Sequence, residues 1–90
     1  MQLDFENADY KATLKAICDW YFPNKYQGPC QGDMFPRLRI KESWRTKSGM
    51  WEVWEEHEPD LYASDQKIAS GRSAASVLRS AFSTLTRWKS

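Results

Sequence analysis

Apolar residues recur every three or four positions near the start of the chain. This spacing predicts an amphipathic helix over residues 8–22, with an apolar stripe made of Tyr10, Leu14, Ile17, Cys18 and Tyr21. Asn7 can cap this helix, because its side-chain oxygen can accept a hydrogen bond from an amide of the first turn. Pro23 ends it, since proline has no amide hydrogen and clashes with the preceding turn. The following segment 23–36, "PNKYQGPCQGDMFP", holds three prolines and two glycines, which predicts a long loop.

Apolar and polar residues then alternate through "RLRIKESWRTKSGMWEVWEEHE", which predicts a β-hairpin with its turn at "TKSG". One face of this hairpin is the expected core face, and it carries Leu38, Ile40, Trp44, Trp51 and Val53. On the other face opposite charges can pair across the strands, with Arg39, Lys41 and Arg45 set against Glu52, Trp54 and Glu56.

The last third of the chain predicts one more strand and a closing helix. The strand falls within "LYASDQKIASG", centred on either residues 61–63 or residues 67–69. Ser73 then caps a helix whose apolar face is formed by Ala74, Val77, Leu78, Ala81, Phe82, Leu85 and Trp88. Its opposite side carries Arg72, Ser76, Arg79, Ser83 and Arg87.

These elements follow one another in the order α-β-β-β-α. The 90 residues suffice for one domain with one small core. We therefore predict a single α+β domain over residues 1–90, in which two helices pack on one face of a three-stranded antiparallel sheet.

The charge of the chain limits the classes of partner. A formal net charge of +1 argues against a strongly basic nucleic-acid-binding protein. The distribution is uneven, because the chain after Asp65 holds five cations and no acid, while residues 52–60 hold five of the twelve acidic residues, which balance them. No apolar stretch is long enough to cross a bilayer and no signal-peptide core is present. We expect a cytoplasmic protein without a membrane partner, and the oligomeric state stays open.

Signatures of catalysis and metal binding are sparse. The single histidine, His57, lies among glutamates and is interpreted as a solvated residue at a strand end. Cys18, Cys30 and His57 lack the close pairing of zinc ligands, and Gly28 and Gly32 match no phosphate-binding loop. We therefore expect a protein that is not an enzyme and has no metal or cofactor. The two cysteines are expected to be reduced thiols, although a bridge between the first helix and the loop is left open.

Binding features are more numerous. Arg72 lies beside the amino-terminal end of the closing helix, where backbone amides favour an anion. Arg79 and Arg87 continue this basic stripe, and Arg45 and Lys47 form a basic hairpin tip. The same arginines could simply provide the polar face that a surface helix needs. Trp54 stands on the charged face of the hairpin, where a tryptophan among arginines is typical of interaction hot spots, although it could instead cover the long loop.

The element order resembles that of the double-stranded RNA-binding domain, whose closing helix follows a segment of the type G-x-S-K-K-x-A-K. Here the matching stretch is "GRSAASVLRSAF", in which Gly71 and Ser73 fit while Ala74 and Ala75 occupy the lysine positions. The family places a histidine at its hairpin loop, where this chain has "TKSG". The resemblance implies the α-β-β-β-α fold. The chain is also similar in style to small accessory proteins of bacteriophages and prophages.

Two functional hypotheses follow. The first is a non-enzymatic, phage-type binding protein that occupies a surface of a host or phage protein and contacts it through Trp54, Arg39, Lys41 and the 23–36 loop. The alternative is a nucleic-acid-binding domain that holds backbone phosphates with Arg72, Arg79, Arg87, Arg45 and Lys47.

Overall fold

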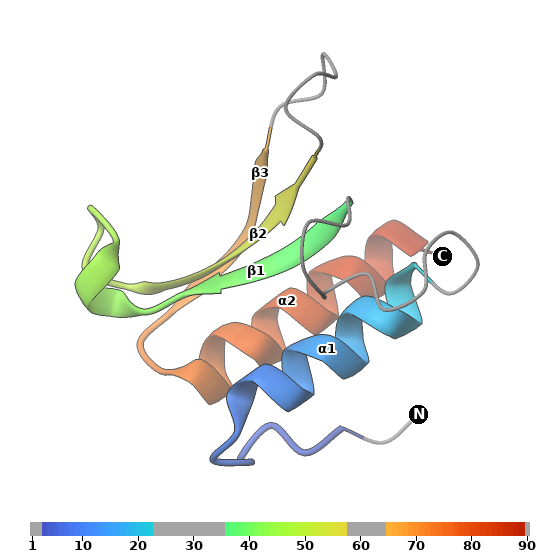
Figure 1. The fold of residues 1–90 in the computed structure, drawn as a ribbon, viewed down its shortest axis with the longest axis horizontal. Helices are drawn as coiled ribbons and strands as arrows, with labels where there is room; N and C mark the ends of the chain where they lie inside the picture. Colours follow the sequence, from blue (N-terminus) through green and yellow to red (C-terminus); the bar gives the residue numbers. More distant parts are fainter. Residues whose placement is uncertain (1–2, 23–35, 58–64, 90) are drawn as a thin grey trace.

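The computed structural model describes residues 3–22, 36–57 and 65–89. The elements are helix α1 (Tyr10–Tyr21), strand β1 (Arg37–Lys41), a one-turn 3-10 helix η1 (Ser43–Arg45), strands β2 (Trp51–Glu56) and β3 (Gln66–Gly71), and helix α2 (Ala74–Lys89). The three strands form an antiparallel sheet in the order β1-β2-β3, and both helices lie side by side on one face of it (Figure 1). The predicted α+β fold is confirmed.

The core lies between the sheet and the two helices. Ile17 of α1, Val53 of β2 and Leu78 of α2 are completely buried. They belong to a cluster whose other members come from the predicted stripes and from the inner face of the sheet, namely Leu14, Cys18, Phe22, Leu38, Ile40, Ile68, Val77, Ala81 and Leu85. Each helix thus buries one apolar stripe, as its 3.6-residue period requires.

Helix α1 begins two residues later than expected. Asp9, not Asn7, is the cap residue, and its side chain accepts a hydrogen bond from the amide of Ala12 (3.4 Å). The side chain of Asn7 instead accepts from the amide of Asp9 (2.9 Å), which makes a tight turn just before the helix. Both residue types can cap a helix, and the turn at Asn7 decides which of them does.

The hairpin keeps its predicted faces, with Ile40 opposite Val53 on the inner face and Lys41 opposite Glu52 on the outer face. The prediction for Trp44 is wrong, because β1 ends at Lys41 and the chain enters η1, where Trp44 is 73% exposed. The Thr46 hydroxyl, 3.1 Å from the Ser43 carbonyl oxygen and 2.7 Å from that of Met50, holds this connection. Such local bonds compete with strand pairing.

The second half of the chain follows the prediction more closely. The strand centred on residues 67–69 is confirmed, and the alternative at 61–63 lies outside the described residues. Ser73 caps α2, since its side chain accepts from the amide of Ser76 (3.1 Å). The placement of Trp88 on the apolar face of this helix is wrong, because Trp88 lies in the last turn beyond the buried Leu85 and is 43% exposed.

Cys18 also departs from expectation. Its side chain is fully buried and disulfide-bonded, so the prediction of a reduced thiol is wrong for this residue, while Cys30 lies outside the described residues. Within the described ranges, neither helix has the length and apolar character needed to span a membrane.

Candidate binding cleft between α1 and β1

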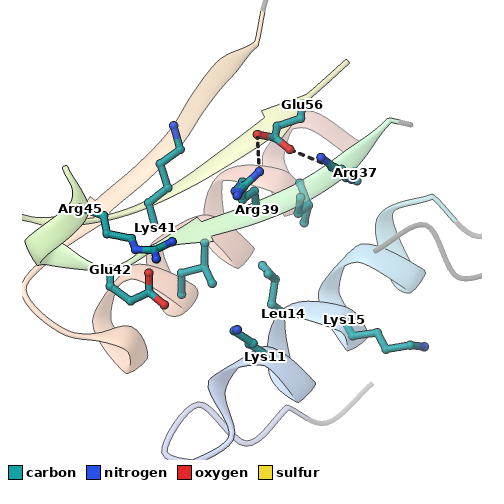
Figure 2. Close-up of a pocket in the computed structure, with 11 residues that line it drawn as sticks. Lys11, Leu14, Lys15, Arg37, Arg39, Lys41, Glu42, Arg45 and Glu56 are labelled. Carbon is teal, nitrogen blue, oxygen red and sulfur yellow. Dashed lines mark hydrogen bonds and ion pairs between the residues drawn. The ribbon is translucent and has the colours of Figure 1, made fainter. Parts of the chain in front are cut away.

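A cleft of about 770 Å³ opens between α1, β1 and the first residues of the hairpin connection (Figure 2). Its lining includes six cationic side chains and two carboxylates, from Lys11, Lys15, Arg37, Arg39, Lys41, Arg45, Glu42 and Glu56. Six minus two leaves a formal charge of +4 in the cleft, whereas the whole chain carries +1. The remainder of the protein is therefore net negative.

Two elements far apart in the sequence build this cleft. Lys11 and Lys15 are one helical turn apart on α1, and Figure 2 shows Lys11 and Leu14 extending from that helix toward β1. The alternation of β1 sends Leu38 and Ile40 into the core, with Arg39 between them and Arg37 and Lys41 at either end of the strand. The cleft consequently has an apolar floor under a cationic rim.

The two carboxylates of the cleft have partners within the protein. Glu56 forms ion pairs with Arg37 at 2.8 Å and with Arg39 at 3.6 Å. Glu42 accepts a hydrogen bond from the Tyr10 hydroxyl at 2.9 Å. The pKa of Glu42 is lowered, first by a hydrogen bond from its own backbone amide and then by Tyr10. Burial, followed by the same contact, raises the pKa of Tyr10. Glu42 is thus ionised at neutral pH.

The cationic side chains of the cleft differ in whether they already form an ion pair within the protein. Lys15 pairs with Asp19 on its own helix at 2.9 Å. Among the described residues, neither Lys11 nor Arg45 lies within ion-pair distance of a carboxylate. Both are exposed, so they are the rim cations most available to an incoming anion.

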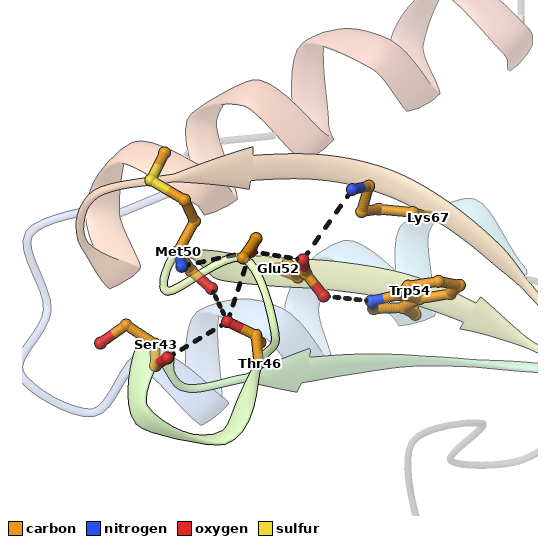
Figure 3. Close-up of polar contacts among 7 residues, drawn as sticks. Ser43, Thr46, Met50, Glu52, Trp54 and Lys67 are labelled. Atoms are coloured by element: carbon orange, nitrogen blue, oxygen red, sulfur yellow. Dashed lines mark hydrogen bonds and ion pairs between the residues drawn. The ribbon is translucent and has the colours of Figure 1, made fainter.

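Trp54 lies on the outer face of the sheet, half-buried among charged groups (Figure 3). Its indole Nε1 donates to Glu52 Oε1 at 2.9 Å, and the Nζ of Lys41 stands 4.7 Å from the ring centroid. Glu52 is only 7% exposed and also accepts from the Ser48 hydroxyl at 2.8 Å, with Lys67 at 3.8 Å. These hydrogen bonds, from Trp54 first and then Ser48, lower the pKa of Glu52.

The structure regroups the residues that the sequence singled out. Arg39, Lys41 and Arg45, which belonged to separate hypotheses, meet in the cleft. Trp54 stands beside Lys41, and Lys47 is exposed at the hairpin tip. Of the 23–36 loop, residues 23–35 lie outside the described residues.

The basic stripe of α2 is exposed as predicted, but none of its arginines lines the cleft. Arg79 binds Glu6 at 2.7 Å and lies over the Phe5 ring at 5.6 Å. Arg87 donates to the Thr84 hydroxyl at 3.4 Å, and Arg72 precedes the Ser73 cap.

Sequence reasoning missed Lys11 and Lys15. Their four-residue spacing off the apolar stripe was visible, but it does not reveal which element their side of the helix faces. His57, at the end of β2, contacts Glu55 at 2.7 Å. No group of three histidine, cysteine or acidic side chains able to hold a metal ion occurs in the described ranges.

Comparisons with protein-family models, curated proteins and solved structures find no match to this chain. The function is therefore inferred from the geometry and charge of the cleft.

Proposed function

We propose that the protein is a non-enzymatic binding protein whose cleft between α1 and β1 takes an acidic segment of a protein partner. The observation that supports this is the concentration of a formal charge of +4 in one cleft of a nearly neutral chain. Complementary charge steers encounter and selects partners. The proposal retains Arg39 and Lys41 as contact residues and adds Lys11, Lys15 and Arg45.

The size and lining of the cleft favour a peptide segment over a nucleic acid. A volume of about 770 Å³ is in the range of pockets for small ligands, so it suits a few residues of a partner chain. Glu42 and Glu56 would repel a continuous row of phosphates. In contrast, a peptide offers backbone amides that these carboxylates can accept from.

Trp54 contributes by presenting Lys41. The ammonium group stands over the indole ring, and such a cation–π contact contributes about 0.5–1 kcal/mol at an exposed site. The Glu52 hydrogen bond in turn holds the indole in place. We therefore assign Trp54 a positioning role for Lys41 at the side of the cleft.

The test measures binding of a fluorescently labelled eight-residue polyglutamate peptide by anisotropy. We expect a Kd of about 50 µM at low salt, equivalent to about −6 kcal/mol, with weaker binding as salt screens the charges. The double variant Lys11→Glu/Arg45→Glu reduces the formal charge of the cleft from +4 to zero and should weaken binding at least about tenfold. Its circular dichroism spectrum should remain that of the wild type.

The matched control is Arg72→Glu/Arg87→Glu, which changes the net charge equally but lies outside the cleft, with Arg72 just before α2 and Arg87 in its last turns. It should change the Kd by less than about threefold. Equal losses in both variants would show that overall charge, not the cleft, drives binding, and would refute the proposal. Eight-nucleotide single strands and duplexes are measured in parallel, and tighter binding of either one that depends on Arg72 and Arg87 would favour the nucleic-acid alternative.

The cytoplasmic location stays a prediction. A disulfide at Cys18 is typical of oxidising compartments, so the location is tested by the redox state of Cys18 in extracts in which free thiols are trapped at lysis. A fully trapped thiol would support a reducing compartment.

A further inference from the structure

Trp44 is the most exposed large apolar side chain of the described residues. It is 73% exposed, whereas Trp88, the next, is 43% exposed. It lies in η1 at the hairpin tip, directly between Ser43 and Arg45 in the chain. Most of the other described aromatic side chains lie in or against the core, the exceptions being Trp54 on the outer face of the sheet and Trp88 at the end of α2.

The tip that carries Trp44 is tied to the body of the protein. The Trp44 ring meets the edge of Trp51 at 5.8 Å and 78°, and Trp51 meets Tyr10 at 5.1 Å and 82°. Thr46 bridges the two sides of the connection through the carbonyls of Ser43 and Met50. Since these contacts hold the ring before binding, less side-chain freedom is lost when a partner covers it.

The same contacts place Trp44 at one end of the basic cleft. Its neighbours Glu42 and Arg45 line the cleft, and Tyr10, at the base of the aromatic row, donates to Glu42. A segment whose acidic residues occupy the cleft therefore reaches Trp44 with the residue just beyond them. Arginine and lysine beside an exposed tryptophan form a composition enriched in interaction hot spots.

We infer that Trp44 is the anchor point of the binding site and that the partner segment carries one apolar or aromatic residue next to its acidic residues. This inference rests on the proposed function, because the acidic residues must occupy the cleft for the apolar residue to reach the tip. The acidic residues supply attraction and Trp44 supplies selectivity among acidic segments.

The experiment is a double-mutant cycle with defined peptides. One peptide has seven glutamates followed by glutamine, and the other has phenylalanine in place of glutamine; a second pair carries the variable residue at the amino-terminal end. For one of these orientations, the wild-type protein should bind the phenylalanine peptide about tenfold more tightly than its glutamine counterpart, which corresponds to about 1.4 kcal/mol. Trp44→Ala should abolish this difference, so that the two peptides bind with the same Kd.

Trp88→Ala is the matched control, since it removes the other exposed tryptophan from α2 and should preserve the tenfold difference. If circular dichroism shows that Trp44→Ala is not folded, the NMR signal of the Trp44 indole N–H in the wild-type protein is followed instead. This signal should shift when the phenylalanine peptide is added and not when the glutamine peptide is added. A preference for phenylalanine that persists in Trp44→Ala, or no preference in either orientation, overturns the anchor while polyglutamate binding stands. No binding of any acidic peptide overturns the proposed function as well.

Discussion

Glu52 is expected to join the hairpin tip to the outer face of the sheet, and Glu52→Gln tests this. The substitution keeps the shape of the side chain but removes its charge. The substitution changes two hydrogen bonds that the Glu52 carboxylate accepts from charge-assisted to neutral. Their donors are Trp54 Nε1 at 2.9 Å and Ser48 Oγ at 2.8 Å. A hydrogen bond to a charged group contributes about 1.5–3 kcal/mol and a neutral one about 1 kcal/mol. The exposed Lys67 at 3.8 Å adds less than about 1 kcal/mol.

The expected loss is therefore about 2 kcal/mol in the free energy of unfolding at pH 7, or about 8–16 °C in melting temperature for a domain of this size. The hydrogen bonds from Trp54 and Ser48 lower the pKa of Glu52 in the folded protein from its ordinary value of 4.5. A lowered pKa means that the ionised form stabilises the fold, so the contribution is complete above about pH 4.5 and is lost as the pH falls through the folded-state pKa. The difference between the two proteins should shrink accordingly in acid.

The assay is urea unfolding followed by tryptophan fluorescence at pH 7, 5 and 3, with the two-state behaviour of small domains. Glu6→Gln is the control, because its ion pair with Arg79 is exposed on both sides and contributes at most about 1 kcal/mol. A difference at pH 7 no larger than that of the control, or a difference that is the same at pH 3, would refute the role assigned to Glu52.

Three further predictions concern stability. Gly71→Ala should lower the free energy of unfolding in urea by about 1–3 kcal/mol, because the new Cβ would lie 2.8 Å from the Val77 amide nitrogen. Gly49→Ala, in open space at φ 72°, should lower it by only about 1 kcal/mol. A larger loss for Gly49→Ala than for Gly71→Ala would contradict the packing at Gly71. Ser73→Ala should lower the free energy of unfolding by about 1 kcal/mol through loss of the α2 cap, and an unchanged urea midpoint would count against that cap. The purified, oxidised protein, unfolded in urea without reductant so that the buried Cys18 becomes accessible, should show no alkylation at Cys18, and reduction should lower its stability by about 2–4 kcal/mol. Alkylation of Cys18 before reduction would contradict the bridge.

The fold was largely predictable because its signals are local. The apolar stripes of α1 and α2 and the alternation of the hairpin each repeat over several residues, so one unexpected residue does not alter the assignment. Trp44 was misassigned for the opposite reason. Alternation alone extends β1 through it, whereas the hydrogen bonds of Thr46 at the tip end the strand at Lys41.

The order of the elements, the faces of the hairpin and most of the core follow from the repeat periods of helix and strand, so the sequence alone predicts them. The candidate site, in contrast, depends on how the elements pack against one another in three dimensions. Lys11 and Arg39 belong to elements separated by residues 23–36 of the sequence, and their charges sum in one cleft only because α1 docks beside β1. The electrostatic character of a surface depends on distances in space, and the packing of the core sets those distances.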